Sequence, residues 1–276
     1  MNHRSNRHTR TDWSRAVVHG FWLMLFALLA ATPAVGEETT AKTLRIAYVE
    51  FPPITFRNDD GDVDGELIDI TRKVVREAGY VPDFVHLPIS RVYLYLKNGQ
   101  IDVWPGLTNI PILNGEVLES WVSPMPVQLS VWYHKDRGHP LEHFDQLSGK
   151  RVIVVAGYTY AGLINWLNQA EDIRITEAPN HRAAINMLKR NRGDYVLDYR
   201  QPIEQILTQP SDNHIVQSEV RTRNAAWLFS LAHPRATILR EEFDDAYLRL
   251  VEAGEVPPVR ELSPGFVIPG FPEQYR

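Results

Sequence analysis

The segment Arg151-Val152-Ile153-Val154-Val155 is an uninterrupted run of β-forming residues, and it is followed by the turn residues Gly157-Tyr158-Thr159. The residues beyond it alternate between helical and strand patterns. The pattern predicts a helix through residues 166 and 167, a strand at 173–175, a helix over 182–190 and a strand at 195–198. Strands that alternate with helices in this order indicate a mostly parallel sheet with helices on its faces.

The same alternation occurs once before in the chain. It begins with the strand-like residues 44–48 and ends at residue 104, before the polar stretch near residues 134–139. The expected elements are a second short extended piece at 54–56, a helix over 67–78, a strand at 84–87, a helix over 92–97 and a strand at 101–104. Two α/β units in tandem therefore predict two lobes.

The carboxyl-terminal part adds one more strand at 226–230 and an amphipathic helix over 239–250. A proline-rich tail follows, from Pro257 to Pro272, and we expect it to pack as an extended strap or to fray rather than to carry chemistry.

Composition and charge exclude several functional classes. The chain has 276 residues, and 29 Lys and Arg against 34 Asp and Glu give a net charge of -5, so a general binder of phosphate backbones is not expected. Cysteine is absent, which excludes thiol nucleophiles, zinc-thiolate sites, iron-sulfur ligation and disulfides. The ten histidines show no metal-ligand spacing, and we expect His134 and His139 to be solvated.

Residues 1–36 have the features of a secretory signal peptide. Four arginines precede the apolar stretch Phe21–Ala31, and small residues at Ala34 and Gly36 form a cleavage site, so the mature chain is predicted to begin near Glu37. An uncleaved membrane anchor is the alternative, but the apolar run is shorter than the roughly 20 residues needed to cross a bilayer. Without a cysteine to carry lipid, the mature protein is expected to be free in the periplasm and not embedded in a membrane.

Several motifs of the chain together resemble the family 3 extracellular solute-binding proteins. The motifs lie in order between Leu44 and Gly254: Leu44-Arg45-Ile46-Ala47, Phe51-Pro52-Pro53, Gly61-x-x-x-Gly65-x-x-x-Asp69-Ile70, Asn98-Gly99-Gln100-Ile101-Asp102, Leu147-Ser148-Gly149-Lys150-Arg151-Val152, Ala156-Gly157-Tyr158-Thr159 and Gly193-Asp194-Tyr195-Val196-Leu197-Asp198. The resemblance implies a type II periplasmic-binding-protein-like α/β fold, with two lobes of mixed sheet flanked by helices and two hinge crossings. Lobe one would be residues 37–132 plus 226–276, lobe two 137–222, and the hinge 133–136 and 223–225.

The resemblance, which is to the polar amino-acid-binding type, also implies a small polar ligand, amino-acid-like or related, held between the lobes, and its binding would favour a closed state. The receptor would present that ligand to the permease of an inner-membrane ABC transporter, or alternatively act on a membrane sensor. A third reading is an enzyme like the cyclohexadienyl dehydratases that share this fold, with Glu50 and Arg91 as the acid-base and anchoring groups. We expect a binding protein with no catalytic residues, no cofactor and no metal.

In this family, a strand-to-helix turn of lobe two presents backbone N–H groups and a hydroxyl to an anionic part of the ligand, which here implies Tyr158 and Thr159. Thr159 as a plain helix N-cap is the alternative. Asp198 occupies the place where the family uses a carboxylate to receive an ammonium group, although a solvated loop position is also open.

The first lobe supplies the other expected contacts. Phe51 and Trp104 are candidates for aromatic residues that form walls of the ligand site. For Trp104, burial in the core is the alternative. Glu50, Gly106 and Thr108 are expected beside them.

The sequence departs from the family at the anchor for the ligand's carboxylate. The family's α-carboxylate-gripping Arg falls on Leu113, and Arg91 on a neighbouring loop is the substitute candidate, unless it is a plain surface residue.

Overall fold

The computed structural model describes Met1 and residues 42–258 and 265–275. The predicted signal peptide lies outside these residues. The helices are α2 (Glu66–Glu77), α3 (Ile89–Lys97), α4 (Leu163–Gln169), α5 (His181–Lys189), α6 (Arg200–Glu204) and α7 (Ala236–Glu252). The strands are β1 (Lys42–Tyr48), β2 (Phe56–Arg57), β3 (Val63–Asp64), β4 (Tyr80–His86), β5 (Val103–Leu107), β6 (Val117–Glu119), β7 (Met125–His134), β8 (Arg151–Val155), β9 (Arg174–Ala178), β10 (Tyr195–Tyr199) and β11 (Ile215–Ser230).

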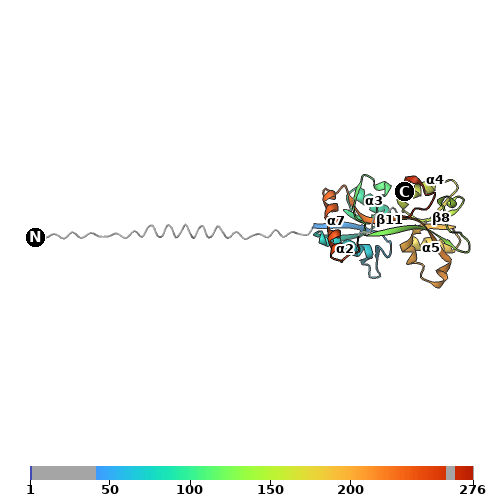
Figure 1. Ribbon diagram of the computed structural model, residues 1–276, viewed down its shortest axis with the longest axis horizontal. Helices are drawn as coiled ribbons and strands as arrows, with labels where there is room; N and C mark the ends of the chain where they lie inside the picture. Colours follow the sequence, from blue (N-terminus) through green and yellow to red (C-terminus); the bar gives the residue numbers. More distant parts are fainter. Residues whose placement is uncertain (2–41, 259–264, 276) are drawn as a thin grey trace. The chain divides into compact units, whose positions relative to one another are not determined.

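One mixed sheet runs through the described residues in the order β4-β1-β5-β11-β7-β10-β8-β9, and β6 is attached to β11. Its first part is the parallel set β4-β1-β5, and its last part is the parallel set β10-β8-β9. Figure 1 shows α2, α3 and α7 beside the first set and α5 beside β8. The observed architecture is the α/β periplasmic-binding-protein-like fold that the sequence indicates.

Strands β7 and β11 join the two parallel sets. They pair antiparallel with each other from Met125↔Ala225 to His134↔Ile215, while β11 also pairs with β5 and β7 also pairs with β10. Leu129 to Trp132 of β7 pair with Tyr199 to Val196 of β10. The two-lobe division itself stays a prediction.

Strand β7 was not expected from the sequence, and β11 is longer than the expected strand at 226–230. Polar residues from Gln217 to Thr222 are half-buried along β11 apart from the buried Val220, so the alternation is weak. The short helix α6 follows β10 directly and ends at Glu204.

The helix expected directly after the turn at residues 157–159 begins later than predicted. Tyr160 and Ala161 adopt left-handed backbone angles, and α4 starts only at Leu163, after the Gly162 cap. The Tyr160 hydroxyl accepts a hydrogen bond from the Val155 N–H at 2.7 Å, so its ring folds back onto β8 and interrupts the helical path. No helix N-terminus therefore points from this turn.

The carboxyl-terminal residues 265–275 form the extended strap that the prolines predict. The Ile268 N–H donates to the Val220 carbonyl and the Thr222 N–H donates to the Phe266 carbonyl, both at 2.9 Å, so the strap lies along β11. Arg221 donates to the backbone carbonyl of Tyr275. Figure 1 shows the chain end beside α4.

The two parallel sets carry the same polar contact. Arg45 at the centre of β1 donates from its backbone N, Nε and Nη2 to Asp102 at 2.6 to 3.1 Å, and Arg151 at the start of β8 donates in the same way to Asp194 at 2.8 to 3.3 Å. Each arginine also donates to a backbone carbonyl of the turn before that aspartate. Each set therefore has its first strand tied to the start of its third.

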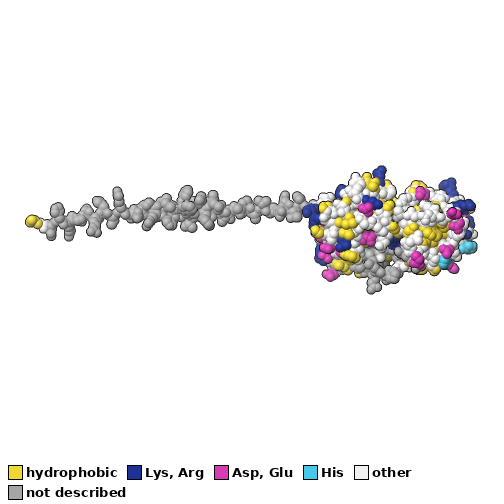
Figure 2. Space-filling model, turned by 90° about the horizontal axis from the view of Figure 1, so that it is seen from above, with side chains coloured by type: hydrophobic (Ala, Val, Ile, Leu, Met, Phe, Trp, Pro, Cys, Tyr) yellow, Lys and Arg dark blue, Asp and Glu magenta, His cyan; other side chains and the backbone are white. Residues whose placement is uncertain are grey.

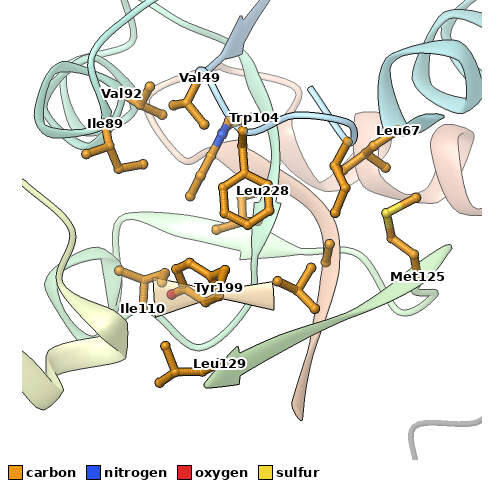
Figure 3. Close-up of a cluster of buried hydrophobic side chains, with 14 of the residues drawn as sticks. Val49, Leu67, Ile89, Val92, Trp104, Ile110, Met125, Leu129, Tyr199 and Leu228 are labelled. Carbon is orange, nitrogen blue, oxygen red and sulfur yellow. The ribbon is translucent and has the colours of Figure 1, made fainter. Parts of the chain in front are cut away.

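The largest apolar cluster spans both sets. Trp227 of β11 is fully buried, and its Nε1–H donates to Thr71 of α2 at 2.9 Å. Figure 3 shows Trp104 of β5 and Tyr199 of β10 in the same buried cluster, near Ile89 and Ile110. The core thus reaches the point where the carboxyl ends of the two parallel sets meet.

Candidate functional site

An apolar pocket lies where β5, β10 and the turn after β8 come together. Its cavity volume is about 50 Å³, and six aromatic side chains contribute to its wall. The lining consists of Val49, Phe51, Ile54, Thr55, Leu67, Ile89, Tyr93, Trp104, Pro105, Gly106, Leu107, Ile110, Val127, Tyr158, Thr159, Tyr160, Tyr199 and Ala225. We call this the inner pocket. None of these lining residues is charged.

Trp104 forms one wall of the inner pocket and is only 4% exposed. Its ring meets Tyr93 edge to face at 5.7 Å between centroids, and it folds over Gly106 so closely that a Cβ there would lie 2.2 Å from the indole. The buried indole Nε1 has no hydrogen-bond partner. A buried donor without a partner costs free energy, so this atom is available to a ligand or a water.

Thr159 lies opposite, in the turn after β8. Its Oγ1 is also buried and makes no well-formed hydrogen bond, and it does not cap the short helical turn that follows. The structure therefore does not use Thr159 as an N-cap. Burial raises the pKa of the nearby Tyr93 hydroxyl to about 12, so that group stays a neutral donor.

Arg223 of β11 is a cation beside the inner pocket that sequence reasoning missed. It is 7% exposed, and its Nη2 donates to the backbone carbonyls of Thr108 and Asn109, while its Nη1 has no partner. No carboxylate of the described residues forms an ion pair with it. Burial lowers its pKa, and the neighbouring Tyr199 and Glu119 oppose that effect. An arginine inside a long alternating strand gave no signal in the sequence.

A second, more polar hollow of about 220 Å³ adjoins the inner pocket and shares Val49, Ile89 and Tyr158 with it. We call it the mouth. It adds Glu50, His86, Leu87, Pro88, Ser90, Val155, Ala156, Gly157, Pro179, Asn180 and His181.

His181 and Asp198 form a buried pair under the mouth. His181 Nδ1 lies 2.7 Å from Asp198 Oδ2, and the Tyr199 N–H donates to the other carboxylate oxygen at 2.8 Å. On its far side, His181 Nε2 lies 3.4 Å from the Tyr158 hydroxyl. Burial lowers the pKa of His181, but the Asp198 carboxylate outweighs this and leaves the pKa raised.

His86 faces the mouth from the end of β4. Its Nε2 lies 3.8 Å from the Glu50 carboxylate. Burial lowers the pKa of His86, and the Arg57 guanidinium lowers it further while Glu50 opposes both. The two histidines of the mouth are therefore shifted in opposite directions.

The structure brings most of the sequence-predicted residues together. Phe51, Trp104, Gly106, Tyr158 and Thr159 line the inner pocket, and Glu50 lines the mouth.

Three other candidates line neither space. Arg91 is exposed, Asp198 is fully buried beneath His181, and Thr108 lines a separate shallow hollow beside Asn109. Leu113, at the place of the missing arginine, is buried in the core at 1% exposure.

Comparison with known proteins agrees with this architecture. A family model described as bacterial extracellular solute-binding proteins, family 3, matches residues 44–257. No curated protein matches the sequence. Among the described residues, no helix is both long and apolar enough to cross a membrane.

Solved structures with low sequence identity share the fold. A histidine kinase sensor domain similar to periplasmic binding proteins superposes with a TM-score of 0.67 at 17% identity, covering 78% of this chain and 92% of its own. An ancestral arginine-binding protein bound to arginine gives 0.65 at 20%, covering 77% and 94%. The ancestral amino acid-binding protein AncCDT-1, a precursor of cyclohexadienyl dehydratase, gives 0.62 at 17%, covering 77% and 91%.

Proposed function

The chain belongs to the bacterial extracellular solute-binding proteins of family 3, and from that membership we propose that it is a periplasmic receptor holding a small ligand in the inner pocket. Family and fold are typical of binding proteins rather than enzymes. The observation that carries the proposal is the unpartnered Trp104 Nε1 in an aromatic-lined pocket. A ligand that accepts a hydrogen bond from the indole would satisfy a group that is otherwise costly to bury.

The pocket chemistry narrows the ligand class. An aromatic wall without charged side chains suits a flat, largely apolar body with one or two hydrogen-bonding groups. Because Leu113 stands at the place of the family's carboxylate anchor, we propose that any carboxylate of the ligand faces the free Nη1 of Arg223. This departs from a standard α-amino acid, whose ammonium and carboxylate groups both need charged partners.

For Asp198 we propose an indirect role. The carboxylate holds the His181 imidazole in place and in its charged form, and His181 presents the resulting N–H to Tyr158 and the mouth. A ligand group at the mouth would then meet a donor, not a carboxylate.

The test is a thermal-shift screen of aromatic acids, amino acids, polyamines and small peptides, followed by calorimetry on the strongest binder. Trp104→Phe removes the indole donor and keeps an aromatic ring, so we expect affinity to fall about 2- to 10-fold, the worth of one hydrogen bond. Trp132→Phe is the matched control, because Trp132 Nε1 is equally buried and unpartnered but lies outside both pockets.

Two outcomes contradict the binding site. Either a folded protein shows no binder across the panel, or Trp104→Phe and Trp132→Phe bind with the wild-type affinity. Thr159→Val adds an independent variant, because it removes a hydroxyl that lines the pocket without changing the size of the side chain much.

The proposed partner is the permease of an inner-membrane ABC transporter, which would recognise the closed, liganded form. A membrane sensor is the alternative partner. In vesicles carrying the permease, liganded protein should stimulate ATP hydrolysis more than ligand-free protein. Specific binding to a sensor ectodomain without such stimulation would favour the alternative. Sequencing of the exported protein should find an amino terminus near Glu37.

A dehydratase-like enzyme is the second candidate, because the chain Tyr158–His181–Asp198 joins a hydroxyl, an imidazole and a buried carboxylate at the edge of the cleft. Turnover of prephenate or arogenate by the purified protein would favour catalysis. Loss of that turnover in His181→Gln, with binding retained, would assign the chemistry to the Tyr158–His181–Asp198 hydrogen-bond series.

A further inference from the structure

Three potential metal ligands meet far from the pocket, at the other end of the β7–β11 pair. His134 is the last residue of β7 and pairs in register with Ile215, the residue after His214. The Lys135 N–H donates to the His214 carbonyl at 2.8 Å. The sheet backbone therefore fixes the two histidines side by side, and Asp136 follows in the turn.

The side chains are already close to a coordinating arrangement. The imidazole rings of His134 and His214 stack with centroids 5.4 Å apart and planes at 19°. Asp136 Oδ2 lies 2.9 Å from His214 Nδ1 and 3.7 Å from His134 Nδ1, and one donor atom of each residue lies within 4.8 Å of the others. Around a tetrahedral zinc with bonds of about 2.0 to 2.1 Å, neighbouring ligand atoms are about 3.3 Å apart. Two of the separations bracket that value, and only the two histidines must approach.

We propose that His134, Asp136 and His214 form a binding site for a divalent transition metal of the zinc, copper or nickel class. Each histidine contributes Nδ1, Asp136 contributes Oδ2, and water completes the coordination. Two imidazoles with one carboxylate match the preference of these metals, whereas magnesium and calcium take oxygen ligands. This site is independent of the ligand pocket.

Two hydrogen bonds at the site must change when a metal binds. His134 Nδ1 accepts a hydrogen bond from the Asp136 N–H at 3.3 Å, and this contact would give way to the metal. His214 Nδ1 lies against the Asp136 carboxylate, and a proton held between them would have to move to Nε2 or leave. Binding should weaken in acid, where protons compete for the imidazole nitrogens.

The surrounding charges select for strong imidazole binders. Lys135 and Arg137 flank Asp136 in the turn, and these cations repel a metal ion. Only a metal that gains much from nitrogen ligation would bind against that repulsion, which favours copper, zinc and nickel over manganese.

Isothermal titration of the full chain with zinc chloride tests the site. Wild type should bind one zinc that is lost or weakened at least about tenfold in His214→Ala and in Asp136→Asn, since even residues that only support a ligand cost about that much. Asp145→Asn is the matched control: His143 and Asp145 have the same spacing, lie 3.3 Å apart and join no third ligand among the described residues.

Further readouts separate the site from general surface binding. Zinc should raise the melting temperature of wild type and Asp145→Asn but not of His214→Ala, because the metal would join the ends of β7 and β11. Cobalt(II) should give intense tetrahedral bands that His214→Ala abolishes. Absence of saturable zinc binding, or equal zinc binding by all four proteins, would overturn the proposal.

Discussion

The two parallel sets of the sheet have the same scaffold and different carboxyl ends. In both, an arginine of the first strand grips an aspartate that precedes or begins the third strand, as Arg45 does with Asp102 and Arg151 with Asp194. Within the third strand the first set carries Trp104 and Gly106 with an unpartnered indole, while the second carries Asp198 bonded to His181. The arginine–aspartate contacts that the two sets share stabilise the fold, and the residues in which the sets differ lie at the inner pocket and the mouth.

The two arginine–aspartate pairs differ mainly in how deeply the aspartate is buried. Removal of the more buried aspartate should have the largest effect on stability. The Asp102 side chain is 6% exposed and that of Asp194 is 34% exposed. Asp102→Ala leaves the Arg45 backbone N–H and guanidinium without their acceptor, so we expect the free energy of unfolding to fall by about 2 to 3 kcal/mol. Asp194→Ala should cost less, because water replaces its carboxylate more easily. Urea unfolding of both variants measures the difference, and equal losses would break the comparison.

Gly106, at the pocket end of the first parallel set, has no room for a side chain. A Cβ would lie 2.2 Å from the Trp104 indole, so Gly106→Ala should displace the ring and cost about 1 to 2 kcal/mol of stability. The same change should weaken the ligand-induced thermal shift.

A double variant shows whether the clash with the Trp104 indole causes the loss of stability in Gly106→Ala. In a Trp104→Val background the clash disappears, so Gly106→Ala should cost little there. An unchanged cost in that background would show that the glycine is needed for another reason.

The mouth histidine of the second set should stabilise the fold most in acid. The pKa of His181 is raised above its ordinary value of 6.5, so its contribution is fully present below pH 6.5 and is lost as the pH rises through the folded-state pKa. The melting-temperature difference between wild type and His181→Gln should therefore shrink with rising pH. A constant difference would mean that the pair with Asp198 is not charged.

The mouth histidine of the first set should show the opposite and smallest dependence. The pKa of His86 is lowered below 6.5, so the folded state loses stability as the pH falls below 6.5. His86→Gln should gain melting temperature relative to wild type in acid and match it above neutrality. Both variants are measured in the same buffers, and slopes of equal sign would contradict the assignment.

Strong local patterns made most of the scaffold predictable. The helix α2 follows from apolar residues such as Leu67, Ile70 and Val74 on one face, and β8 follows from its unbroken β-forming run. Strand β7 and the first half of β11 were missed because their partners are distant in sequence and their inner faces include polar residues such as Ser130 and Arg223. Pairing across such distances leaves little local periodicity.

The site was predictable only where a residue's role depends on its own strand end. Phe51 and Thr159 follow strands β1 and β8, Trp104 lies within β5, and all three line the inner pocket. The position of Arg223 beside the pocket and the contact of His181 with Asp198 both depend on contacts between separate elements. The His134–Asp136–His214 cluster likewise needs a residue 78 positions away, which no spacing rule reveals.

The length of β11 has a consequence for the order in which the chain folds. On the edge of β5 that faces away from β1, the partner strand is β11, which pairs through Ala225 to Phe229. Strands β1, β4 and β5 are all complete by residue 107. A chain that crosses the membrane with its amino-terminal end first must therefore leave the β5 edge uncovered until most of it has emerged. Exposed strand edges invite pairing with other chains, so chaperone dependence during export should be concentrated in that interval.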